Sequence, residues 1–259
     1  MGVNEQTKTD NAFTQAYANL NKAQQEAVDT IEGPVLVVAG PGTGKTQILT
    51  LRIANILRQT DTLPENILAL TFTESGAKAM RERLRRYLGS AAYRVAIYTF
   101  HGLANQLISR YPDAYPRIAG GRPVSDIEQL LLIESILTDK QFTLLCPTGN
   151  PTFYVPHLIR TIGTLKQENI TPEGLRELLR EQEKTLVNTP QFHEKGAHKG
   201  KVRSEYANLE KQIAKNHELA AVYERYQALL QDTQWYDYND MLLETVQALA
   251  NNEDMIHDL

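Results

Sequence analysis

The feature that most constrains the fold of this chain is a glycine-rich loop between an apolar run and a helical pattern. The apolar run, residues 35–39 (VLVVA), is uninterrupted and rich in β-branched residues, which is typical of a strand buried on both faces of a sheet. The loop follows as residues 40–46, GPGTGKT. Residues 45–58 then place their apolar side chains on one stripe, which predicts a helix. Strand, glycine turn and helix in this order indicate an α/β architecture.

The alternation of apolar run and helical pattern occurs twice more. Residues 66–72 and 94–98 are typical of further buried strands. The first is followed by a helix that we expect to be capped by Thr73 and to end at Gly89, and the second by a helix that opens at residues 99–102. Repeated strand–helix units predict a parallel sheet with helices on both faces.

Beyond about residue 110 the chain is mostly helical in pattern, and no further buried strand is evident. A capping-box pattern at Ser125 and the pair Thr171-Pro172 predict helix starts. Residues 193–203 (HEKGAHKGKVR) are polar and interrupted by glycine, which favours a loop, and residues 205–231 predict one long helix. We therefore expect an α/β domain with a helical insertion.

Composition excludes several classes of protein. With 42% hydrophobic and 22% charged residues among 259, the chain can bury a core in one large or two small domains. Its 27 Lys and Arg against 31 Asp and Glu give a net charge of -4, which disfavours a histone-like binder but not a local basic groove. A single cysteine, Cys146, excludes a disulfide framework and a cysteine-rich zinc site. No apolar run approaches the roughly 20 residues of a membrane span, so we expect a cytoplasmic protein with no membrane partner.

The glycine-rich loop has the chemistry of a phosphate-binding site. It fits the Walker A pattern, with Ala39 in the first position. Glycines let backbone N–H groups turn towards phosphate oxygens, and the helix N-terminus adds a partial positive charge. A lysine at this position reaches the β- and γ-phosphates, and the hydroxyl after it suits a Mg²⁺ ligand. The expected nucleotide-binding residues are Gly40, Gly42, Thr43, Gly44, Lys45 and Thr46, with Lys45 catalytic and Thr46 the Mg²⁺ ligand.

Further segments accompany the loop in a defined order along the chain. Residues 20–28 (LNKAQQEAV) precede it; residues 69–73 (ALTFT), 77–84 (AKAMRERL) and 98–102 (YTFHG) follow it, and residues 236–242 (YDYNDML) lie near the end. In this order they resemble the Q-motif, motif Ia, the next DNA-contacting motif and the segment before motif II of superfamily 1A DNA helicases related to UvrD, Rep and PcrA. The resemblance is strongest in the first hundred residues.

The resemblance implies a domain plan. It comprises a flexible lead-in over 1–15, a RecA-like domain 1A of the P-loop NTPase class over 16–110, a helical insertion like subdomain 1B over 111–235 and a return to domain 1A over 236–259. It also implies ATP and Mg²⁺ as cofactors and single-stranded or partially duplex DNA as the partner.

The resemblance further assigns roles to individual residues. Gln24 would hydrogen-bond the adenine edge, which needs one donor and one acceptor. Phe72 would stack on a base of single-stranded DNA, and Thr73, Thr99 and His101 would contact its backbone. Each has a plain structural alternative: a helix-cap glutamine for Gln24, a core aromatic that closes the strand for Phe72 and a packing histidine for His101. The sequence departs from the family pattern at residues 74–76, which are Glu-Ser-Gly where the family commonly has Asn-Lys-Ala. A carboxylate at Glu74 would repel a DNA phosphate.

The chain contains no Asp-Glu dipeptide. An ATPase of this family needs one at the end of an apolar strand, to hold Mg²⁺ and activate the attacking water. We therefore expect the N-terminal part of an ATP-dependent 3′-to-5′ helicase or translocase, with domains 2A and 2B elsewhere in the parent protein. By itself it would bind nucleotide at most weakly and neither hydrolyse ATP nor unwind DNA, and its sheet would be incomplete. The alternative is a naturally short, non-catalytic nucleotide- or DNA-binding module that regulates a helicase.

Overall fold

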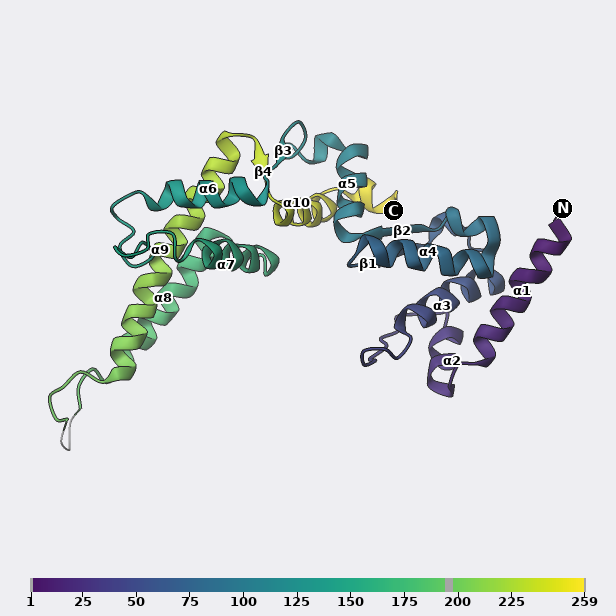
Figure 1. The fold of residues 1–259 in the computed structure, drawn as a ribbon, viewed down its shortest axis with the longest axis horizontal. Helices are drawn as coiled ribbons and strands as arrows, with labels where there is room; N and C mark the ends of the chain where they lie inside the picture. The colour runs from purple at the N-terminus through teal and green to yellow at the C-terminus, as the bar shows by residue number, and fades with distance from the viewer. Residues whose placement is uncertain (1, 194–197, 259) are drawn as a thin grey trace. The chain divides into compact units, whose positions relative to one another are not determined.

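The computed structural model describes residues 2–193 and 198–258, which group into two compact units (Figure 1). Unit 1 comprises Met1–Gln106 with His257–Leu259, and unit 2 comprises Leu107–Ile256. The division between them falls after Gln106. Within the described part of the chain, no helix combines the length and apolarity that crossing a bilayer requires.

Unit 1 has the predicted alternation of helices and parallel strands. Strands β1 (Leu68–Thr71) and β2 (Ala96–Thr99) pair in parallel, with Leu68 opposite Ala96 and Thr71 opposite Thr99. Helix α4 packs along them (Figure 1). The remaining elements are α1 (Gly2–Ala18), α2 (Lys22–Asp29), α3 (Lys45–Gln59), the 3-10 helices η1 (Pro64–Asn66) and η2 (Gly89–Tyr93), α4 (Glu74–Leu88) and α5 (Phe100–Arg110), which contains the boundary with unit 2.

The core of unit 1 forms where α3, α4 and the two strands meet. Ile53 from α3 and Leu84 from α4 pack against Ala69 and Ile97 of the strands, and all four are buried. The predicted cap of α4 is present, since the Thr73 hydroxyl accepts a hydrogen bond from the backbone of the first turn. These local predictions held because capping and apolar periodicity act over only a few residues.

The predicted first strand, residues 35–39, is not a strand. The run has no regular secondary structure and no ladder partner, and the exposed fractions of Leu36 and Val38 are 90% and 91%. β1 pairs with β2 along one edge, and no segment among residues 2–193 and 198–258 pairs with its other edge. An apolar run becomes a buried strand only beside a neighbour that satisfies its backbone groups and covers its faces. The expected burial is therefore wrong, whereas the expected incompleteness of the sheet is observed.

The first residues, expected to be a flexible lead-in, belong to helix α1. Phe13 on α1 meets Tyr87 of α4 edge to face, with ring centroids 6.3 Å apart. The Arg58 guanidinium lies 4.6 Å from the Phe13 ring centroid and pairs with Asp10 at 2.6 Å. The residues that contact α1 thus lie on α3 and α4, which are distant in sequence. The polar composition of the first residues therefore did not indicate that they form a packed helix.

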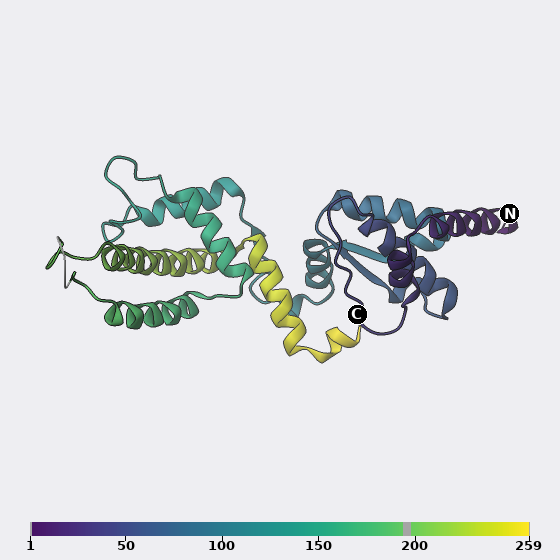
Figure 2. The same ribbon diagram turned by 90° about the horizontal axis from the view of Figure 1, so that it is seen from below.

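Unit 2 is mostly helical, as predicted. Its elements are η3 (Pro112–Ala114), β3 (Arg122–Pro123), α6 (Asp126–Leu137), α7 (Val155–Gln167), α8 (Pro172–Asn188), α9 (Ser204–Asp232), β4 (Trp235–Tyr236), α10 (Tyr238–Asn251) and α11 (Glu253–His257), whose last residue belongs to unit 1. Helix α8 lies along α9 in both views (Figures 1 and 2). The predicted caps at Ser125 and Thr171 are present. Of the predicted loop 193–203, residues 194–197 lie outside the described residues.

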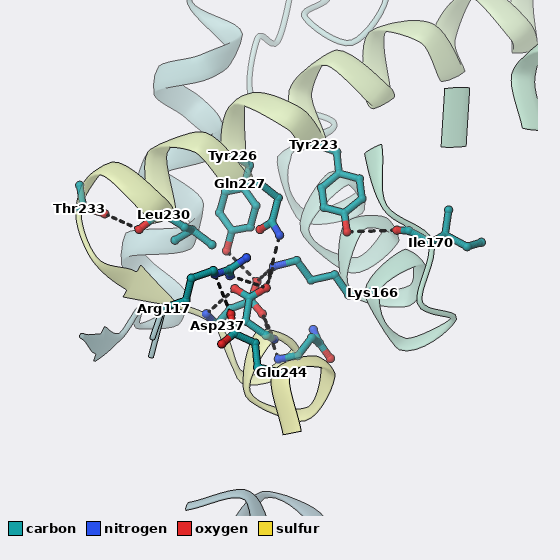
Figure 3. Close-up of polar contacts among 12 residues, drawn as sticks. Arg117, Lys166, Ile170, Tyr223, Tyr226, Gln227, Leu230, Thr233, Asp237 and Glu244 are labelled. Atoms are coloured by element: carbon teal, nitrogen blue, oxygen red, sulfur yellow. Dashed lines mark hydrogen bonds and ion pairs between the residues drawn. The ribbon is translucent and has the colours of Figure 1, made fainter. Parts of the chain in front are cut away.

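Residues 236–256, expected to return to the first domain, instead group with unit 2. A buried ion cluster holds them there (Figure 3). The Lys166 ammonium on α7 lies 2.5 Å from Asp237 Oδ2 and 2.8 Å from Asp240 Oδ1, at the start of α10. The Tyr226 hydroxyl on α9 donates to Asp237 Oδ2 at 3.2 Å. We call Lys166, Tyr226, Asp237 and Asp240 the Lys166 cluster, and it joins three helices of unit 2.

Candidate phosphate-binding loop and aromatic edge

The glycine-rich loop in unit 1 turns sharply into helix α3. Gly42 and Gly44 have φ angles of 75° and 82°, in the left-handed region that glycine adopts without strain. Gly44 is the N-cap of α3 and provides no side-chain hydrogen bond to its first turn. The first N–H groups of the helix therefore keep their capacity to bind an anion, supported by the helix dipole.

The side chains of the loop supply a cation and two hydroxyls. The Lys45 ammonium donates to the carbonyl oxygens of Ala39 at 3.1 Å and Gly40 at 2.8 Å, so it lies across the loop. The Thr43 hydroxyl also donates to the Gly40 oxygen, at 2.8 Å. Thr46 lies in the first turn of α3, half-buried. Left-handed glycines, an ammonium and a hydroxyl at a helix start form a donor set that fits a nucleoside triphosphate with Mg²⁺.

Gln24 connects helix α2 to this loop. Its backbone N–H and side-chain oxygen form a capping box with Asn21, at 3.0 and 2.9 Å. Its side-chain nitrogen donates to the carbonyl oxygen of Thr43 at 3.1 Å. Gln24 therefore does cap helix α2, which is the structural alternative to a nucleotide contact. The same side-chain amide also lies at the glycine-rich loop. Contact with an adenine edge stays a prediction.

The predicted DNA-contacting residues gather at the carboxyl ends of β1 and β2. Phe72 is 89% exposed, so the alternative of a core aromatic is wrong. The Thr73 hydroxyl accepts from the Gly76 N–H at 3.0 Å in capping α4. Thr99 is buried and donates to Glu74 Oε1 at 2.8 Å. His101, in the first turn of α5, is half-buried. The Thr73 and Thr99 hydroxyls thus have structural partners. DNA binding by all four residues stays a prediction.

Sequence reasoning missed one aromatic residue at this edge. Phe100 is 41% exposed, and its ring centroid lies 5.4 Å from that of Phe72, with the ring planes 55° apart. Because Thr71 and Thr99 are opposite each other in the parallel ladder, the residues that follow them emerge side by side. The available signal in the sequence was that a threonine-phenylalanine pair, Thr71-Phe72 and Thr99-Phe100, ends each of the two predicted strands. Only the register of the strands shows that the two phenylalanines lie together.

The left-handed glycine loop that leads into α3, in a unit that also contains parallel strands, places the chain in the phosphate-loop class of folds. The particular family follows from comparison with known proteins. Residues 20–259 match the UvrD/REP helicase N-terminal domain, and the chain belongs to this family.

Curated relatives are bacterial proteins named ATP-dependent DNA helicase PcrA. The chain is 37% identical to the Bacillus subtilis protein over 163 residues, which cover 61% of this chain and 21% of that one. It is 29% identical to the Staphylococcus epidermidis (RP62A) protein over 228 residues, and to the Staphylococcus aureus (NCTC 8325) protein over 230 residues. Each of those two matches covers 88% of this chain and 26% of the relative. The chain therefore spans about a fifth to a quarter of the length of these relatives.

Proposed function

We propose that this chain is the ATP-binding N-terminal part of a 3′-to-5′ DNA helicase or translocase that acts on single-stranded or partially duplex DNA. The observation that carries the proposal is the loop geometry, in which two left-handed glycines lead into α3 and the Lys45 ammonium is held at the loop by the Gly40 carbonyl. Membership of the UvrD/REP family supports ATP as the nucleotide. The remainder of the parent, including domains 2A and 2B, would supply the other half of the ATP cleft.

In nucleotide binding, Lys45 would exchange two backbone acceptors for phosphate oxygens. Its ammonium now donates to the carbonyls of Ala39 and Gly40, so the charge is already held at the loop. Thr46 would hold Mg²⁺ through its hydroxyl, and the ion would neutralise charge on the phosphates. Gln24, tied to the Thr43 carbonyl, would place its amide beside the adenine.

Hydrolysis requires acidic groups that we do not assign to this chain. Asp237 and Asp240 are occupied by Lys166 in the buried cluster of unit 2, where they cap α10. We propose that the parent provides the Asp-Glu pair on a strand that also pairs with residues 35–39. The exposed apolar run would then become buried, as its sequence predicts.

A binding titration with a fluorescent ATP analogue and Mg²⁺ tests the proposal. We expect saturable binding by the wild-type chain and a roughly 10- to 150-fold weakening in Lys45→Ala, since hydrogen bonds to charged groups are worth about 1.5–3 kcal/mol. Lys78→Ala, which removes an exposed lysine from α4, is the matched control and should bind like wild type. Absence of binding by a cooperatively folded wild-type chain, or equal loss in both variants, contradicts the proposal.

A second candidate is a non-catalytic nucleotide- or DNA-binding module that regulates a helicase. The lack of an Asp-Glu dipeptide favours it. Reading the gene past Leu259 separates the two candidates, because an apolar strand ending in Asp-Glu supports the helicase and a stop codon supports the module.

A further inference from the structure

Phe72 and Phe100 form an exposed aromatic pair at the ends of two adjacent strands. Their ring centroids are 5.4 Å apart, and the exposed fractions of the two residues are 89% and 41%. Each follows the last residue of its strand, and those residues, Thr71 and Thr99, are paired in the ladder. The backbone of the sheet therefore fixes the spacing of the two rings, and burying the rings in a ligand would remove apolar area from water.

The Thr99 hydroxyl at this edge offers little to a phosphate group. The Thr99 hydroxyl donates to Glu74 Oε1 at 2.8 Å and accepts from the Gly102 N–H at 2.9 Å. Glu74 lies in the first turn of α4, where its negative charge is favoured by the helix dipole. A phosphate that approached Thr99 would have to displace this carboxylate and would be repelled by it.

We infer that Phe100 is a second base-stacking residue and that it forms, with Phe72, a platform for two unpaired bases of single-stranded DNA. The inference rests on the proposed function and specifies that the two rings contact bases, while Glu74 keeps phosphates away from Thr99. A planar base stacks face to face on one ring, and planes 55° apart cannot both be parallel to a single base. Each ring therefore takes its own base. Stacking on an aromatic is worth about 1–3 kcal/mol per base and tolerates any sequence.

The test compares two labelled oligonucleotides of equal length and charge, oligo(dT) and an abasic strand, by fluorescence anisotropy with the full chain. We expect tighter binding of oligo(dT), and a loss of roughly 5- to 150-fold in Phe100→Ala and in Phe72→Ala. Phe100→Trp keeps a stacking face and should bind like wild type. Tyr93→Ala, which removes another exposed aromatic residue of unit 1, is the matched control and should retain affinity.

Glu74→Gln tests the electrostatic part of the inference. Removing the carboxylate should raise affinity for both oligonucleotides and make binding more dependent on salt, since a phosphate can then approach Thr99. Unchanged affinity and an unchanged salt slope would contradict the assignment of Glu74 as the group that keeps phosphates away.

Several results overturn the platform. These are equal binding of oligo(dT) and the abasic strand, wild-type affinity in Phe100→Ala, or no binding of oligo(dT), as expected if the rings serve a protein partner instead. The ATP-analogue titration on the same variants keeps the two proposals distinct. A chain that binds the analogue but shows one of these results loses the platform and keeps the nucleotide site.

Discussion

Replacing Lys166 with methionine removes a buried ammonium that lies between two carboxylates. The Lys166 side chain is 0% exposed, and those of Asp237 and Asp240 are 5% and 2% exposed. Methionine keeps most of the aliphatic packing, so the change removes mainly the charge. The nearby Arg117 compensates little, because it lies 3.5 Å from Asp240 while its closer contact is Glu244 at 2.7 Å.

The expected cost follows from the burial of the partners left behind. Removing one partner of a buried ion pair typically destabilises a protein by about 3–5 kcal/mol, since an uncompensated charge stays in the interior. For a unit of about 150 residues, each kcal/mol lowers the melting temperature by roughly 2–4 °C, so Lys166→Met should lower that of unit 2 by roughly 6–20 °C. Adding Asp240→Asn should recover part of the loss, because one fewer unpaired charge remains.

The assay is thermal and urea unfolding followed by tryptophan fluorescence. Trp235 is the one tryptophan of the chain and immediately precedes the segment that holds Asp237, so its emission reports on unit 2. Lys184→Met is the matched control: its ammonium is 2.6 Å from Glu181, but both side chains are 69% exposed, and such pairs contribute little. If the Lys166 and Lys184 variants unfold at the same temperature, the reasoning from burial is refuted.

Two further predictions concern a titration and the exposed apolar run. Hydrogen bonds from Arg122, and then from Ser125, lower the pKa of the Glu128 carboxyl to about 2. The ionised carboxylate therefore stabilises the start of α6 fully above the pKa that Glu128 has in the unfolded chain, and this stabilisation is lost as the pH falls towards about 2. Arg122→Gln should raise that pKa towards its usual range, measurable by NMR titration, and an unchanged value would contradict the cause given. Leu36→Ser should raise solubility and leave the free energy of unfolding of unit 1 unchanged, as measured in urea by circular dichroism. Leu51→Ala, at a fully buried position, should lower that free energy by about 2–5 kcal/mol. Similar effects of the two substitutions would contradict the exposure observed.

Predictions from sequence succeeded where the signal is local. The capping box of Ser125 with Glu128 involves residues three apart, and it predicted the start of α6. The same holds for the loop of Gly42 and Gly44, because a left-handed turn into a helix is set by the glycines themselves. The turn into α3 could therefore be located before any tertiary contact was known, and phosphate binding by its residues stays a prediction.

Tertiary structure decided what depends on distant neighbours. The Lys166 cluster joins residues 71 and 74 positions apart, and no local pattern indicates that a lysine and two aspartates will be buried together. That cluster also ties the start of α10 to α7 and α9 of unit 2. The pairing of Phe72 with Phe100 likewise depended on the register of β1 and β2.

The apolar run at residues 35–39 shows most directly which properties the sequence determines and which depend on tertiary structure. Its sequence by itself determined a β-branched segment with a preference for strand that leads into a glycine-rich turn, because these preferences reside in the residues. Whether the segment becomes a buried strand was decided by tertiary structure alone. Its backbone needs hydrogen-bonding neighbours and its side chains need covering layers, and Leu36 and Val38 remain exposed without them.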